Sequence, residues 1–162
     1  MTKAVVDTNI VFSAFLNTSS RIAQPLISGS SFFRFYAPDY LKDEIALHKS
    51  RIMKLSSLNE EGFQEVHRLL LRNVSIIDMK LIPEFVLVEA EKLCENIDPD
   101  DFAFVALGLY LKAPLWTGDK RLISGLTGNK RVRFVSTDGI FEALIDAENR
   151  DRWTSISKRK KK

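Results

Sequence analysis

The 162-residue chain has the length of one domain, and 45% of its residues are hydrophobic, enough for a sizeable core. No apolar run approaches the ~20 residues of a membrane span, and Asp7 interrupts the apolar start where a signal peptide would continue. The single cysteine, Cys94, is typical of a reducing compartment. We therefore expect a cytoplasmic protein without a membrane partner.

The net charge of +3 comes from the C-terminal end of the chain. The last five residues are all basic, and subtracting them from the 24 basic residues leaves 19 against 21 acidic ones. A basic tail can bind nucleic acid by releasing counterions, although a solvated end without a partner has the same composition. We expect a folded domain over residues 1–150 and a basic, flexible tail over 151–162.

Short apolar segments alternate with helical patterns in the first half of the chain. An aromatic-rich segment favours a strand, and a Ser/Gly cluster before it ends a helix. The expected elements are a strand over 3–7, helices over 10–16 and 21–27, a strand over 32–37, a helix from Asp39, a helix from Asn59 to Asn73 and, over 74–81, an extended connection or a short strand.

The helix that begins at Asp39 has a clear apolar stripe. Leu41, Ile45, His48 and Ile52 recur at the spacing of one helical face. On the same wheel Asp43 points nearly opposite the stripe, whereas Glu44 lies at its edge. We therefore expect Asp43 in solvent and Glu44 at the border of the core.

The second half is organised around residues 102–111, which carry no charge and predict a helix buried on every side. Asp98 and Pro99 supply its start signal, with Asp100 and Asp101 in the first turn. Gly108 inside this helix predicts a close packing contact. Around it we expect a helix over 83–96, a strand over 113–119, a helix over 120–126, a strand over 132–136 and a last helix, capped by Asp138, to about Ala147.

Beyond Arg150 we expect fraying, with Trp153 packed back onto the domain. The alternation of strands and helices predicts an α/β fold: a three-layer sandwich whose central, mostly parallel, twisted sheet of four to five strands is flanked by helices. The sequence contains no GxGxxG, P-loop, CxxC or HExxH motif, which excludes the usual dinucleotide, P-loop and zinc sites. His48 and His67 fall on or near apolar stripes and are interpreted as packed or surface residues.

Four carboxylates fall where a parallel sheet binds ligands, at the carboxyl ends of its strands. Asp7 and Asp119 follow strands, and Asp101 and Glu44 lie in early turns of helices. Each alone could cap a helix or be solvated. Together they would repel one another and need a hard divalent cation, Mg²⁺ or Mn²⁺. One or two such ions would activate water for phosphodiester hydrolysis, without a covalent intermediate.

The chain resembles the PIN-domain family of metal-dependent ribonucleases, which includes the VapC-like toxins of toxin–antitoxin pairs. The resemblance runs from Val5 to about Ala147. It rests on Val5-Val6-Asp7-Thr8-Asn9, on Tyr40-Leu41-Lys42-Asp43-Glu44-Ile45, on Asp98-Pro99-Asp100-Asp101 leading into Phe104-Val105-Ala106-Leu107, and on Leu115-Trp116-Thr117-Gly118-Asp119. The resemblance implies an RNA substrate, commonly a homodimer, and a small antitoxin protein as a possible partner.

Position by position, the resemblance implies that the metal-binding and catalytic acids are Asp7, Glu44, Asp101 and Asp119. Asp98 and Asp100 are alternatives for the third acid, and Asp98 also supports the site as a helix cap. Thr8 or Asn9, and Thr117 beside Asp119, would hold the acids by hydrogen bonds. Candidate phosphate contacts, each equally consistent with a solvated charge, are Lys49, Arg51, Lys54, Lys120 and Arg121.

Two other functions compete with the ribonuclease. A non-catalytic module would bind RNA or a protein through the same fold, although a degenerate member is expected to lack one of the four acids. A phosphotransfer domain would use Asp7 as its nucleophile. That chemistry favours an Asp-x-Asp-x-Thr motif, whereas this chain has Asp7-Thr8-Asn9-Ile10-Val11.

Overall fold

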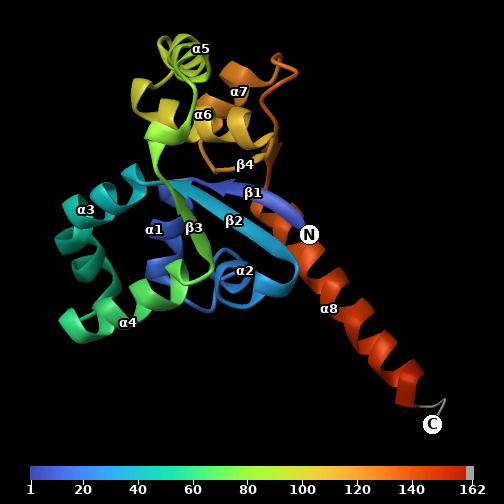
Figure 1. Ribbon diagram of the computed structural model, residues 1–162. Helices are drawn as coiled ribbons and strands as arrows, with labels where there is room; N and C mark the ends of the chain where they lie inside the picture. Colours follow the sequence, from blue (N-terminus) through green and yellow to red (C-terminus); the bar gives the residue numbers. More distant parts are fainter. Residues whose placement is uncertain (160–162) are drawn as a thin grey trace.

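A sheet of five strands forms the centre of the protein (Figure 1). The computed structural model describes residues 1–159, without the side chains of 156 and 157. The strand order is β3-β2-β1-β4-β5, and each neighbouring pair is parallel. The strands are β1 (Thr2–Val6), β2 (Phe33–Pro38), β3 (Val74–Ile77), β4 (Leu115–Trp116) and β5 (Phe134–Val135).

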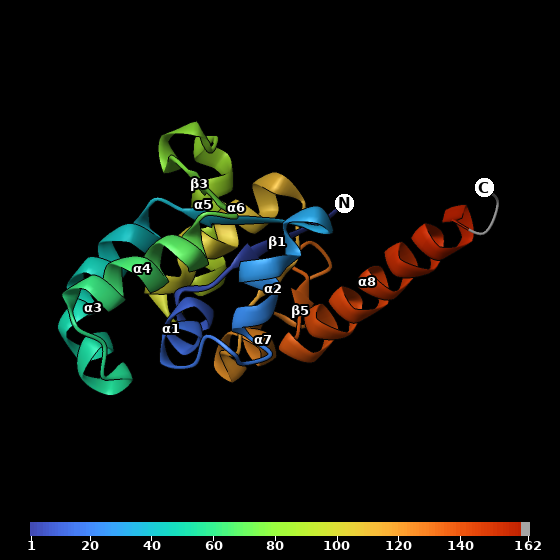
Figure 2. The same ribbon diagram turned by 90° about the horizontal axis from the view of Figure 1, so that it is seen from below.

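Helices connect the strands and cover both faces of the sheet, as parallel strands require. In Figures 1 and 2, α5, α6 and α7 lie on one face and α1, α2 and α4 on the other. This arrangement confirms the predicted three-layer α/β sandwich. The helices are α1 (Thr8–Leu16), α2 (Ala23–Ser28), α3 (Tyr40–Ser56), α4 (Glu60–Leu71), α5 (Glu84–Cys94), α6 (Phe102–Leu111), α7 (Lys120–Leu126) and α8 (Thr137–Arg159), with 3₁₀ turns η1 (Gly29–Ser31), η2 (Met79–Leu81) and η3 (Pro99–Asp101).

The hydrophobic core is divided by the sheet into two clusters. Successive side chains of a strand point to opposite faces, so Ala4 and Val6 of β1 join the cluster under α1–α4 and α8, while Val5 joins the cluster under α5–α7. All three are fully buried. Because both faces are covered, β1 is apolar and fully buried from Ala4 to Val6, directly before the acidic Asp7.

Helix α6 is buried along its length, as its uncharged sequence predicts. Gly108 makes the expected close contact: an added Cβ would lie 2.8 Å from Cδ2 of Leu115 and 3.3 Å from the carbonyl oxygen of Ala113. The small residue lets α6 approach β4 closely. That approach sets the position of the N-terminal end of α6, where the acidic residues lie.

The C-terminal helix differs from the prediction at both ends. It begins at Thr137, and the hydroxyl of Ser136 accepts a hydrogen bond from the N–H of Gly139 at 3.0 Å. Asp138, the expected cap, instead forms an ion pair with Arg21 at 3.1 Å.

Helix α8 also continues to Arg159 instead of ending near Ala147, and its second half projects from the body (Figures 1 and 2). Trp153 is 72% exposed on that half, so the expected packing of this side chain onto the domain is wrong. Residues 160–162 of the expected tail lie outside the described residues, and the division of the chain near residue 150 stays a prediction. Over residues 1–159, no helix has both the length and the apolar composition needed to cross a bilayer.

Candidate active site

The ends of the two central strands place a threonine against an aspartate. Val6 pairs with Trp116 in the parallel register of β1 and β4, so the next residues, Asp7 and Thr117, lie side by side. The Thr117 hydroxyl donates a hydrogen bond of 2.6 Å to Oδ2 of Asp7, and both residues are buried. Thr117 also accepts a hydrogen bond of 3.0 Å from the N–H of Asp119.

Asp7 is a buried carboxylate at the start of α1. It lies at the N-cap position of α1 with extended backbone, but its side chain makes no cap hydrogen bond to the described chain. Burial raises the pKa of Asp7, and the charge of Glu44 acts in the same direction. The Thr117 hydroxyl, followed by the nearby N–H groups of Asn9 and Thr8, partly opposes this rise in pKa. Asp7 is therefore held mainly by Thr117, and the N–H groups at the start of α1 act on it more weakly.

Asp101 lies where η3 passes into α6, and the charges of four other acids act on it. Its Oδ2 is buried and has no hydrogen-bond partner within residues 1–159. Burial raises the pKa of Asp101 to about 7, with further increases from the charges of Asp7, Asp98, Asp119 and Glu44, in that order. The charges that act most strongly on this carboxyl are thus all negative.

Asp119 and Asp98 both cap helical turns. Oδ1 of Asp119 accepts hydrogen bonds of 2.8 Å from the Arg121 N–H and 3.0 Å from the Leu122 N–H, which begins α7. The side chain of Asp98 accepts a hydrogen bond of 3.0 Å from the N–H of Asp100, as the start signal before Pro99 predicts. The cap uses one oxygen of Asp119, and this residue still acts on Asp101 through its charge.

Glu44 reaches the same region from α3. It is half-buried whereas its neighbour Asp43 is exposed, as the helical wheel predicts. Tyr40 lies one turn earlier, and burial, followed by the charges of Glu44 and Asp100, raises the pKa of its phenol. Sequence reasoning did not single out Tyr40, although its four-residue spacing from Glu44 is a signal that could have done so.

The remaining polar candidates have different surroundings. The buried Thr8 hydroxyl has no hydrogen-bond partner in the described part of the chain, and Asn9 is exposed. Of Thr8, Asn9 and Thr117, it is Thr117 whose side chain donates a hydrogen bond to one of the four acids in the described chain. Asn9 of α1 and Arg51 of α3 line a groove of about 420 Å³ between these two helices, together with other residues of both.

Two of the five basic candidates already have protein partners. Lys49 donates a hydrogen bond of 2.6 Å to Glu60, and Arg121 donates one of 2.8 Å to the carbonyl oxygen of Ile97. The other three, Arg51, Lys54 and Lys120, are exposed. Both histidines are packed against aromatic rings, His48 against Phe12 and His67 against Phe15 and Phe63, as interpreted from the sequence.

The donor set fits a hard divalent cation. Asp7, Glu44, Asp101 and Asp119 supply only carboxylate oxygens, the ligands that Mg²⁺ and Mn²⁺ prefer. The buried, unpartnered Oδ2 of Asp101 is an atom that such an ion would satisfy. As the side chains stand in residues 1–159, no three His, Cys, Asp or Glu residues form a ready-made ligand group.

Comparison with known proteins identifies the family. The model of the PIN domain matches residues 5–138, which is most of the chain, and the protein therefore belongs to the PIN-domain family. Among solved structures, eight chains match. One, the crystal structure of VapBC2 from Rickettsia felis bound to a DNA fragment from their promoter, has a TM-score of 0.64 at 16% identity, covering 83% of this chain and 98% of that chain. No curated protein sequence matches.

The crowding of acids around Asp101 predicts an unusual pH dependence of stability in EDTA. The folded-state pKa is about 7 against 3.8 for an ordinary aspartate, so this group stabilises the fold below about pH 4. That stabilisation is lost as the pH rises through 7. We expect Asp101→Asn to be more stable than the wild type at pH 8, by on the order of 1–2 kcal/mol, and similar at pH 4.

Urea unfolding at the two pH values measures this difference. Asp100→Asn is the matched control, because Asp100 is the exposed neighbour, and its stability should follow the wild type. An Asp101→Asn protein that is clearly less stable than the wild type at pH 8 would show that the carboxylate has a structural role.

Proposed function

We propose that the protein is a divalent-metal-dependent endoribonuclease that hydrolyses RNA phosphodiester bonds with Mg²⁺ or Mn²⁺. The observation that carries the proposal is the half-buried Asp101 carboxyl, whose buried Oδ2 has no partner in the described chain and whose pKa is raised by four other acids. Such a cluster is costly without a compensating positive charge. Membership of the PIN-domain family supports nuclease activity.

Each acid has a defined part in this proposal. Asp7 and Asp119 from the strand ends, Asp101 from α6 and Glu44 from α3 would bind the ion. When bound, a divalent cation makes a water molecule more acidic and neutralises charge on the leaving oxygen of a phosphodiester. Thr117 is a positioning residue, because its hydroxyl fixes Asp7 and receives the Asp119 N–H.

We further propose that the protein is the toxin component of a toxin–antitoxin pair, with a small antitoxin protein as its partner. The resemblance to VapC-like toxins in the motifs around Asp7 and Asp101 supports this, as does the fold shared with VapBC2. A homodimeric state and a cytoplasmic location are part of the same proposal.

Cleavage of a mixed pool of structured and single-stranded RNA tests the activity. The wild type should cut with Mn²⁺ or Mg²⁺ and be inactive in EDTA, and Asp7→Asn should lower the rate by about 100-fold or more. Asp43→Asn removes an equal charge from an exposed position of α3 and should cut like the wild type. Absence of cutting in every condition would support the non-catalytic binding module instead.

Substitution of Thr117 tests the positioning role separately. Thr117→Val keeps the shape but removes the hydroxyl that bonds Asp7 and Asp119, and should lower the cleavage rate about 10- to 100-fold and raise the Mn²⁺ concentration needed for half-maximal activity. Thr117→Ser keeps the hydroxyl and should restore most of both. Equal activity of the valine and serine variants would exclude a positioning role for this hydroxyl.

A further inference from the structure

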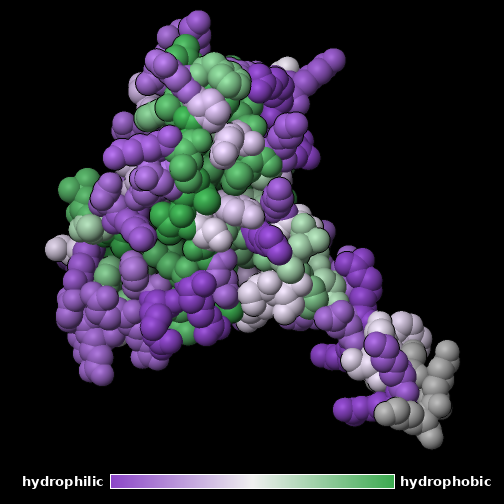
Figure 3. Space-filling model, viewed as in Figure 1, coloured by the Kyte–Doolittle hydropathy of each residue, from purple (hydrophilic) through white to green (hydrophobic). Residues whose placement is uncertain are grey.

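The second half of α8 takes no part in the folded core. The last buried residues of the helix are Ile140, Leu144 and Ala147, and from residue 150 onward each described side chain is exposed. Figure 3 shows mainly hydrophilic side chains on this projecting part. A helical segment without tertiary packing is only marginally stable by itself. Its composition therefore reflects something other than burial.

The charge of this segment is opposite to that of the body. Residues 150–162 contain seven basic residues and one acidic residue, which leaves 17 basic and 20 acidic residues in 1–149. A polyanion would be attracted to the helix by counterion release. The same polyanion would meet an acidic body and a site made of carboxylates. The C-terminal segment would thus attract a nucleic acid, whereas the acidic body would repel it.

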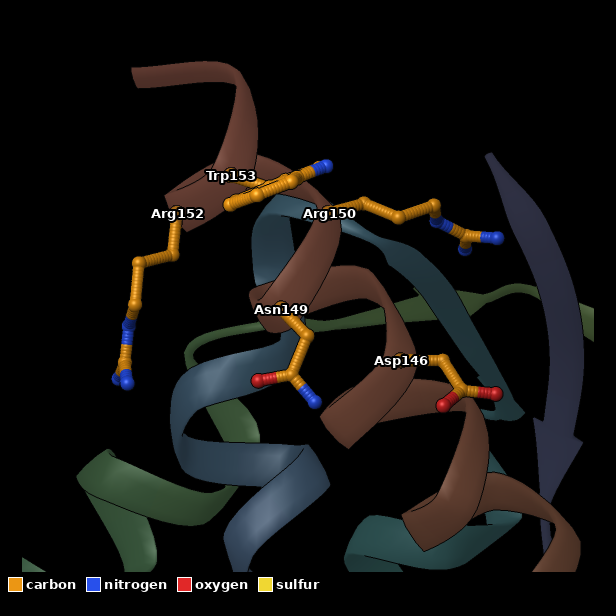
Figure 4. Close-up of a pocket in the computed structure, with 5 residues that line it drawn as sticks. All are labelled: Asp146, Asn149, Arg150, Arg152 and Trp153. Carbon is orange, nitrogen blue, oxygen red and sulfur yellow. The ribbon is translucent and has the colours of Figure 1, made fainter. Parts of the chain in front are cut away.

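The projecting helix also presents an aromatic ring between arginines. Trp153, Arg150, Arg152, Asp146 and Asn149 lie together on an open face of α8 (Figure 4). The indole of Trp153 is 72% exposed. Exposed indole rings stack with nucleobases whatever their sequence, while guanidinium groups bind the phosphates. One helical turn therefore offers both kinds of contact that single-stranded nucleic acid needs.

We propose that residues 150–159 of α8 form a second RNA-binding element, which holds a single-stranded part of the substrate at a distance from the carboxylates. The inference rests on the proposed ribonuclease function and names the form of substrate that the enzyme would take. A second copy of this chain would also offer an acidic surface to the helix. The combination of an indole with two arginines favours RNA, because base stacking makes use of the ring as well as the charges.

Binding of a single-stranded RNA 12-mer in EDTA, where the metal needed for cleavage is removed, tests this element apart from catalysis. Trp116 is fully buried and Trp153 is exposed, so quenching of tryptophan fluorescence on RNA addition reports on Trp153. We expect quenching in the wild type, and about tenfold weaker binding of Trp153→Ala by fluorescence anisotropy of a labelled RNA.

Charge variants give the second readout. In Arg150→Gln/Arg152→Gln the slope of log affinity against log salt should become shallower by about 1.4, because each phosphate that an arginine neutralises on a single strand adds about 0.7 to the slope. The matched control is Lys80→Gln/Lys130→Gln, which removes the same charge from exposed positions of the body and should keep the wild-type slope.

Three results would overturn the proposal: no quenching, equal affinity in all variants, or equally weakened binding in the control pair. Sedimentation of the RNA-free proteins adds a fourth. A larger wild-type assembly that Arg150→Gln/Arg152→Gln dissociates would assign the helix to a second copy of the chain. Because these measurements need neither metal nor cleavage, their outcome is independent of whether the protein cuts RNA.

Discussion

The hydrogen bond from Thr117 to Asp7 joins the ends of the two central strands, and the acidic site is arranged around that junction. Strand order puts β1 between β2 and β4, so the residue that leaves β1 enters the middle of the carboxyl edge of the sheet. Asp7 is held there by a neutral hydroxyl instead of a positive charge. The bond orients the carboxylate but leaves its negative charge uncompensated.

That negative charge adds to the effect of burial on the neighbouring Asp101. Asp101 has a pKa of about 7 because it is buried among other carboxylates, and a protein selected only for stability would not keep such a cluster. The helices that bring the acids together are well packed: α6 is buried along its length and fits closely against β4 at Gly108. Packing energy from the core therefore supports an arrangement that electrostatics alone opposes.

Much of this arrangement follows from local sequence patterns. The apolar runs before Asp7 and after Asp101 predicted a buried strand and a buried helix, and a parallel sheet then places strand ends at one edge. The pairing of Thr117 with Asp7 could not be predicted from local patterns, because 110 residues separate the two. That the buried Thr8 hydroxyl has no hydrogen-bond partner within residues 1–159 likewise depends on packing and not on local sequence.

The C-terminal helix shows a different reason for failure. Ser136 and Asp138 are both good cap residues, and the ion pair of Asp138 with Arg21, distant in sequence, is what distinguishes them. The extension of α8 beyond Ala147 lacks an apolar stripe, because it does not pack against the core. Periodicity can locate helices only where one face is buried.

The most direct test of the account is calorimetric titration of the metal-free protein with Mn²⁺ in buffers of different ionisation enthalpy. If Asp101 binds the cation, association at pH 7 should release about half a proton from this group, more at pH 6 and less at pH 8. Asp101→Asn should weaken binding and remove the proton release. Failure of the wild type to bind Mn²⁺ at pH 8, or unchanged binding by Asp101→Asn, would contradict the assignment of these carboxylates as a metal site.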